Sequence, residues 1–153
     1  MQNNCIKNLL NFKEVVIKNI KNLKASVEVY AELLISEQTC PCCGTRTSKI
    51  HDHYVQPIKD IPIHLKPTTI FLRKTRYECP SCGKSFYPSN EVVARYNRKS
   101  TRLVGYIVDQ LRKNISASNI AKSLNIDSGF ISKMLPYLSV STSSLPRVLC
   151  IDE

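Results

Sequence analysis

Two short cysteine motifs constrain this chain more than any other feature of its sequence. Residues 40–44 (CPCCG) and 79–83 (CPSCG) share the pattern Cys-Pro-x-Cys-Gly. Two residues between the cysteines let one tight turn direct both sulfurs to the same point, and the glycine lets the backbone fold back over a metal. Four thiolates complete the tetrahedral shell of zinc and leave no open position for chemistry. The sequence therefore predicts a structural Zn²⁺ site with the ligands Cys40, Cys43, Cys79 and Cys82.

The spacing between the two motifs departs from the usual pattern. Four-cysteine sites commonly leave about 15–20 residues between the pairs, whereas 35 residues separate Cys43 from Cys79. We therefore expect the interval to form strands of its own. The alternatives are ordinary buried thiols or a disulfide pair. Cys42, His51 and His53 are rival ligands, since two histidines at i and i+2 face the same way on a strand.

The charge of the chain indicates a polyanionic partner. Its 153 residues carry 22 Lys and Arg against 12 Asp and Glu, a net charge of +10. Nucleic acid is the commonest partner of such a chain, and a merely solvated basic surface is the alternative. The seven cysteines are odd in number and show no disulfide framework. No signal peptide or membrane-length apolar run is visible, so we expect a cytoplasmic, nucleoid-associated protein that keeps its thiols reduced.

The residues up to the second cysteine motif read as a small β domain. Alternating apolar residues predict strands over 14–20 and 25–35, with a turn at 21–24, and β-branched and aromatic residues predict a strand over 68–77. Prolines at 57, 62 and 67 exclude a helix and favour short extended pieces. From these pieces we expect Ile58 and Leu65 to pack inward. The result is a zinc-stapled β domain over residues 1–88, whose core is thin without the metal.

Basic residues near the second motif and after it are candidates for phosphate contacts. Lys74 and Arg76 end the strand that leads into the second motif. Residues 89–100 hold few large apolar side chains and read as a basic linker. Its cations are Arg95, Arg98 and Lys99, which we expect to contact DNA phosphates.

A helical period begins at residue 101. Apolar positions predict a first helix from Thr101, a second over 116–124 and a third over 128–137. Ser116 and Asp127 suit N-caps, and Asn125 suits a turn residue with positive φ. Together with the small Ala121 at the crossing of the helices, this pattern indicates a helix-turn-helix domain over residues 101–138.

The third helix of this domain would read DNA. It would present Ser128, Ser132 and Lys133 to a major groove. A three-helix bundle without a DNA role is the alternative. The predicted fold class is thus α+β, with a small zinc-stapled β domain followed by a three-helix helix-turn-helix domain.

The last residues read as the start of another domain. Residues 139–144 form a Ser-rich linker, and 148–151 resemble the beginning of a buried strand followed by Asp152 and Glu153. Since a strand at the last residue has no partner, we expect residues 139–153 to be a linker and the truncated start of a further domain.

The order of these motifs resembles the N-terminal part of insertion-sequence transposases of the ISL-three family. The resemblance rests on the two cysteine motifs, residues 51–53 (HDH), residues 58–62 (IKDIP), Phe86 and the helix-turn-helix pattern. It implies binding of double-stranded DNA at the terminal inverted repeats of the element. It also implies a following ribonuclease H-like catalytic domain, with Asp152 as its first carboxylate. Since the chain would lack the other carboxylates of two-metal chemistry, we expect no catalysis. The oligomeric state is left open, a homo-oligomer included.

Two other classes of protein share parts of this pattern. A zinc-ribbon transcription regulator would share every feature except the terminal strand. A thiol redox enzyme would use the Cys-x-x-Cys pairs, but such pairs usually begin a helix within a βαβ unit, and neither pair has that context.

Overall fold

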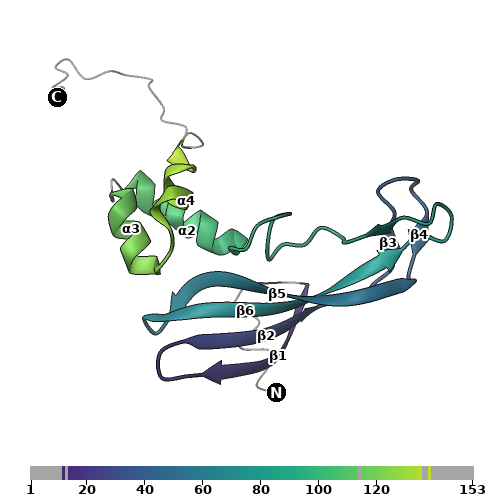
Figure 1. Ribbon diagram of the computed structural model, residues 1–153, viewed down its shortest axis with the longest axis horizontal. Coiled ribbons are helices and arrows are strands. Elements are labelled where there is room, and N and C mark those ends of the chain that lie inside the picture. Colours follow the sequence, from purple (N-terminus) through teal and green to yellow (C-terminus); the bar gives the residue numbers. More distant parts are fainter. Residues whose placement is uncertain (1–11, 13, 114, 136–137, 139–153) are drawn as a thin grey trace, which may run out of the picture. The chain divides into compact units, whose positions relative to one another are not determined.

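The computed structural model describes residue 12 and residues 14–113, 115–135 and 138. The chain divides into two compact units: unit 1 is Met1–Ile107 and unit 2 is Val108–Glu153. Unit 1 carries the strands and unit 2 carries helices (Figure 1). The α+β class predicted from the sequence is confirmed at this level.

A mixed β-sheet forms the body of unit 1. Its strands follow the order β1-β2-β6-β5, with β7 paired to β6 (Figure 1). β1 with β2 and β5 with β6 are antiparallel pairs, whereas β2 and β6 run parallel. A separate pair, β3 with β4, lies beyond the sheet. The bounds are β1 Val15–Asn22, β2 Val27–Leu33, β3 Gln38–Thr39, β4 Arg46–Thr47, β5 Ile50–Ile63, β6 Lys66–Glu78 and β7 Ser85–Phe86.

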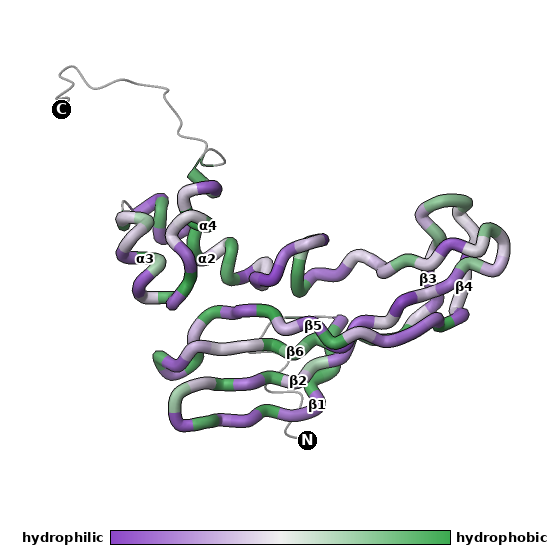
Figure 2. The backbone as a smooth tube through the Cα atoms, viewed as in Figure 1, coloured by the Kyte–Doolittle hydropathy of each residue, from purple (hydrophilic) through white to green (hydrophobic). Residues whose placement is uncertain are grey.

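Alternation of apolar residues explains the first two strands. Val27, Val29 and Ala31 of β2 are buried, and the residues between them are partly exposed. The same alternation is visible along the tube in Figure 2. The strands predicted over 14–20, 25–35 and 68–77 are confirmed to within two residues at each end. The first turn lies later than predicted, because Leu23 N donates to Ser26 O at 2.9 Å.

β5 is one continuous strand of 14 residues, so the expectation of short extended pieces was wrong. β5 stands at the end of the strand order, and an edge strand tolerates proline because its outward N–H groups have no ladder partner. Lys59 uses its N–H to bind Arg98 O at 2.9 Å, outside the sheet. Pro57, two residues earlier, points its nitrogen to the same side by the period of the strand.

The turn between β5 and β6 exposes a residue that we expected inside. His64 and Leu65 have φ of 51° and 61°, as a two-residue hairpin turn with positive φ at both positions requires. Leu65 is 99% exposed. Ile58 is fully buried as predicted, but the expectation for Leu65 was wrong because the turn directs its side chain away from the sheet.

Residues 89–100 pack against the sheet instead of hanging free as a linker. Val92 and Val93 are buried in the hydrophobic cluster of β1, β2, β5 and β6. Ser100 N donates to Lys59 O at 2.9 Å, which, with the bond from Lys59 N, pairs the segment with the edge of β5. The sequence indicated a linker because the segment holds few large apolar residues. Two valines are nevertheless enough to pack it against the sheet.

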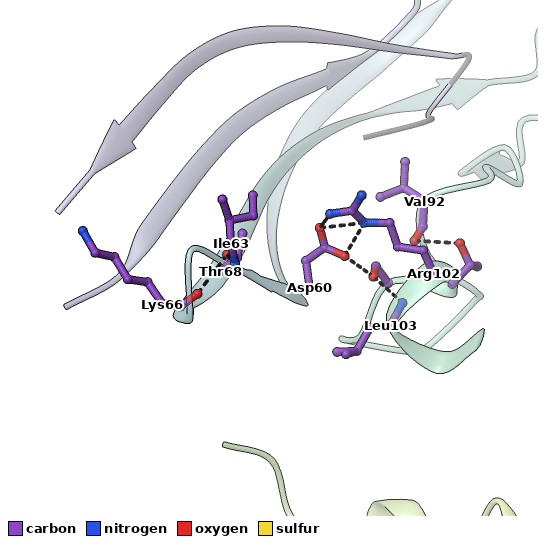
Figure 3. Close-up of polar contacts among 9 residues, drawn as sticks. Asp60, Ile63, Lys66, Thr68, Val92, Arg102 and Leu103 are labelled. Carbon is purple, nitrogen blue, oxygen red and sulfur yellow. Dashed lines mark hydrogen bonds and ion pairs between the residues drawn. The ribbon is translucent and has the colours of Figure 1, made fainter. Parts of the chain in front are cut away.

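A buried carboxylate fixes the end of this segment and the start of α2 (Thr101–Arg112). The side chain of Asp60 is fully buried, and Arg102 binds it through Nε at 2.8 Å and Nη2 at 2.6 Å. Ser100 Oγ donates to Asp60 Oδ1 at 2.5 Å and accepts from Leu103 N at 3.1 Å. Figure 3 shows Asp60 facing Arg102 across this contact. Ser100 thus acts as the N-cap of α2, and Asp60 holds its side chain in place.

Unit 2 holds two further helices joined by a tight turn. α3 spans Ala117–Leu124 and α4 spans Ser128–Ser132. Ser116 and Asp127 are their N-caps, and Asn125 has φ 50° and ψ 50°, all as predicted. Ile120, Ala121, Leu124 and Ile131 are buried. None of the helices among the described residues is long and apolar enough to cross a membrane.

The third helix is shorter than the predicted span 128–137. Hydrogen bonds from Lys133 N to Gly129 O and from Met134 N to Ile131 O turn the chain after Ser132. The end of the predicted span, residues 136–137, lies outside the described residues, as do residues 139–153. The structure therefore shows a helix, a turn and a short helix, and a three-helix helix-turn-helix domain stays a prediction.

We expect Asn125→Ala to destabilise unit 2 by about 1 kcal/mol, because alanine in the left-handed region carries the strain of a Cβ without the local hydrogen bonding of the short polar asparagine side chain. Asn125→Gly should be neutral or slightly stabilising. Urea unfolding followed by helical circular dichroism measures both changes. Lys122→Ala, at an exposed position of α3, is the control and should stay within about 0.5 kcal/mol. An alanine variant as stable as the glycine variant would contradict the explanation.

Candidate metal centre and basic surface

The two cysteine motifs form the same turn on two different strand pairs. Cys40 N donates to Thr45 O and Gly44 N donates to Cys40 O, at 2.9 and 3.0 Å. In the second motif Cys79 N donates to Lys84 O and Gly83 N to Cys79 O, both at 2.9 Å. The first turn joins β3 to β4 and the second joins β6 to β7. Both are therefore short hairpins closed by identical bonds.

The glycine of each turn is required by its backbone conformation. Gly44 has φ 74° and Gly83 has φ 67°, which L-residues rarely adopt. A Cβ placed on either glycine would meet no atom within 4 Å. The glycines are therefore required by the positive φ of the turn, and not by a lack of space for a side chain.

Four sulfurs converge between the two turns. Cys40 Sγ lies 3.7 Å from Cys82 Sγ, and Cys43 Sγ lies 3.4 Å from Cys79 Sγ. The ligand atoms of all four residues lie within 4.8 Å of one another. Four ligands about 2.3 Å from a tetrahedral zinc ion are about 3.8 Å apart. The separations exceed the ~2.05 Å of a disulfide and fit a closed structural zinc site, as predicted.

Hydrogen bonds to sulfur favour the thiolate form, which zinc needs, at Cys43 and Cys40. The side chain and backbone of Thr45 lower the pKa of Cys43 to about 6. Backbone N–H groups of Cys43 and Cys42 lower the pKa of Cys40. The Lys84 backbone N–H also lowers the pKa of Cys82, but burial and the three neighbouring sulfurs outweigh it and raise that pKa to about 12. The pKa values of neighbouring cysteines move in opposite directions because adjacent thiolates repel one another, so that some sulfurs keep their protons. A divalent cation at their centre would offset the repulsion.

The rival ligands lie elsewhere. Cys42 is exposed and lies beside Lys84, whose pKa it raises through a side-chain hydrogen bond. His51 Nδ1 lies 3.2 Å from Asp52 Oδ2, and His53 Nδ1 lies 3.2 Å from Thr75 Oγ1. Among the residues that the structure describes, the four cysteines are the only group of three or more potential metal ligands that comes together.

The two predicted phosphate-binding residues of β6 are not fully exposed: Lys74 is partly buried, and Arg76 contacts neighbouring side chains. Lys74 is half-buried, and this burial lowers its pKa. Arg76 Nη1 lies 3.6 Å from Asp52 Oδ2, and its guanidinium lies 5.9 Å from the centre of the Tyr87 ring. Arg76 would have to give up these contacts to bind DNA, and the role of both residues in DNA binding stays a prediction.

The other predicted DNA-binding residues lie at exposed or partly exposed positions. Arg95 and Arg98 are exposed and Lys99 is half-buried in unit 1. In unit 2, Ser128, Ser132 and Lys133 are exposed along α4 and its end. Ser132 Oγ already donates to Ser128 O at 3.1 Å. The role of these six residues in binding stays a prediction.

Sequence reasoning missed three residues that the structure makes important. Thr45 Oγ1 lies 3.3 Å from Cys43 Sγ and lowers the pKa of that thiol, and its position directly after the motif glycine was a usable signal. Asp60 belongs to residues 58–62, part of the family resemblance, but nothing in the sequence indicated that it pairs with Arg102. Tyr96 gave no signal at all, because its exposure and backbone conformation depend on how residues 89–100 dock.

Comparison with known proteins agrees with the metal centre. A family model described as the zinc-finger of transposase IS204/IS1001/IS1096/IS1165 matches residues 36–82. Searches of curated proteins and of solved structures give no significant match. The matched span begins just before β3 and ends on the fourth cysteine. The chain thus contains a segment similar to the zinc ribbon of these transposases, with four clustered cysteines that fit a structural zinc ion.

Proposed function

We propose that this chain is the DNA-binding part of an insertion-sequence transposase and binds double-stranded DNA at the terminal inverted repeats of its element. The observation that carries the proposal is the match of residues 36–82 to the transposase zinc-finger family, on a segment whose cysteines form a closed site. A closed site organises a fold and performs no chemistry of its own.

Two further features support DNA as the partner. The net charge of +10 favours a polyanion. The α3–turn–α4 segment has capped helices, a left-handed turn residue, and a buried isoleucine on each helix, Ile120 and Ile131, which is the pattern expected of a helix-turn-helix. We propose that residues 101–138 read the major groove with Ser128, Ser132 and Lys133, while basic residues of unit 1 contact phosphates.

The proposal assigns binding, and no strand cleavage, to these residues. Two-metal phosphoryl chemistry needs several converging carboxylates, and the described residues bring together cysteines only. Asp152, which the family resemblance suggests as a catalytic carboxylate, lies outside the described residues.

Fluorescence anisotropy with the zinc-loaded chain tests the proposal. We expect the inverted-repeat duplex to bind tighter than a shuffled duplex of equal composition, by roughly 10³-fold if recognition is specific. Arg98→Ala, at an exposed basic position of unit 1, should weaken binding and lower the slope of log K against log salt concentration by about 1, because one phosphate contact is lost.

Lys18→Ala removes the same charge from a residue that is paired with Glu32 at 2.8 Å, and it should leave the slope unchanged. Equal affinity for both duplexes would mean that only charge is at work, and end recognition would be wrong.

A further inference from the structure

The turn at residues 94–97 presents an aromatic ring to solvent on a strained backbone. Asn97 N donates to Ala94 O at 3.1 Å, so Arg95 and Tyr96 are the central residues of the turn. Tyr96 has φ 63° and is 90% exposed. A positive φ at this position of a turn is usually taken by glycine or asparagine, and for a bulky residue it costs stability. The fold gains no packing from this ring in return.

The turn is held rigidly although its tip is exposed. Asn97 Oδ1 accepts from Arg98 N at 2.8 Å and from Lys99 N at 3.2 Å. Gln56 Nε2 on β5 donates to Asn97 O at 2.7 Å, and Arg98 O accepts from Lys59 N at 2.9 Å. The backbone on the C-terminal side of Tyr96 is therefore fastened to β5, and the ring is pre-positioned.

The surroundings of the ring are suited to a nucleotide. The guanidinium of Arg95 lies 4.9 Å from the centre of the Tyr96 ring, a cation–π contact that covers one face. The other face remains available for stacking, since the side chain is so exposed. Arg98 and Lys99 follow, and no acidic residue lies between 94 and 100. Within the part of the chain that the structure describes, neither Arg95 nor Arg98 takes part in an ion pair.

We propose that Tyr96 stacks on the base of an unpaired nucleotide, while Arg95 and Arg98 contact the adjoining phosphates. A base in an intact duplex has both faces covered by its neighbours, whereas an unpaired base offers a free face to an aromatic side chain. The inference rests on the proposed DNA-binding function and adds to it a preference for DNA that carries unpaired nucleotides.

The test compares a blunt duplex with the same duplex carrying a short single-stranded tail, with 2-aminopurine at the first unpaired position. We expect the wild-type chain to bind the tailed DNA roughly 5- to 100-fold tighter, the range of one base stacked on an aromatic ring. Its binding should quench the 2-aminopurine fluorescence. Tyr96→Gly should remove both effects and leave affinity for the blunt duplex unchanged, while Tyr96→Phe should retain them.

Thermal unfolding separates this role from a structural one. Tyr96→Gly should have a melting temperature no lower than the wild type, because glycine relieves the positive φ. Leu65→Gly is the matched control: it relieves an exposed residue with φ 61° in the other strained turn, and it should leave the preference for the tail intact.

Equal wild-type affinity for blunt and tailed DNA would overturn the inference and leave the proposed function standing. A Tyr96→Gly variant that keeps both the preference and the quenching would also overturn it. A chain that binds the tailed DNA through Tyr96 but shows no preference for inverted-repeat duplex would support the inference and count against the proposed function.

Discussion

Replacing Cys79 by serine is expected to abolish zinc binding and to unfold the two cysteine turns together with the short strands β3, β4 and β7. Cys79 is fully buried and its sulfur lies 3.4 Å from that of Cys43. Serine offers no thiolate, so the closed shell of four sulfurs is broken. Metal content measured by mass spectrometry should fall from one zinc per chain to none. Cobalt-substituted protein should lose the visible absorption that tetrahedral thiolate ligands produce.

The loss of structure should be local. β3 and β4 have two residues each, and such short strands have little stability without the metal. The hydrophobic cluster around Val29, Ile58 and Leu72 is built on β1, β2, β5 and β6 together with Val92 and Val93, and it contains no cysteine. Amide hydrogen exchange should accelerate at residues 38–47 and 79–86, while the amides of Val29 and Leu72 stay protected.

Cys42→Ser is the matched control. Cys42 lies between two ligands in the sequence but is exposed and outside the sulfur cluster. This variant should keep one zinc per chain and the exchange pattern of the wild type. Retention of zinc by Cys79→Ser, or its loss in Cys42→Ser, would show that the ligand set is wrong.

Arg102→Met is expected to destabilise unit 1 by about 3–5 kcal/mol, because it leaves the carboxylate of Asp60 buried without its partner. The Asp60 side chain is fully buried and that of Arg102 is 24% exposed. Methionine keeps the length and apolar stem of arginine, so the loss reports mainly on the ion pair. Chemical denaturation followed by the signal of the sheet measures the change.

Two comparisons make this result specific. Arg73→Met breaks an exposed pair with Glu32, 2.8 Å long, and should cost less than about 1 kcal/mol. The double variant Asp60→Leu with Arg102→Met should recover most of the stability, since it removes both buried charges. An Arg102→Met variant no less stable than Arg73→Met would contradict the role of Asp60 as the anchor of α2.

Short-range patterns account for what the sequence by itself determined. The zinc ligands were predictable because each pair lies within one turn, where the spacing and the following glycine fix how the sulfurs point. The strand β2 followed from alternation, and the caps Ser116 and Asp127 and the left-handed Asn125 followed from local side-chain chemistry. Each of these features depends on residues only a few positions apart.

Tertiary structure alone decided the rest. The parallel pairing of β2 with β6, the docking of Val92 and Val93, and the ion pair of Asp60 with Arg102 join residues far apart in sequence. No local pattern encodes such contacts, because they depend on which chain segments the sheet brings together after long loops close. The exposure of Tyr96 belongs here too: it follows from the bonds that tie Asn97 and Arg98 to β5, and so does the candidate nucleotide contact built on it.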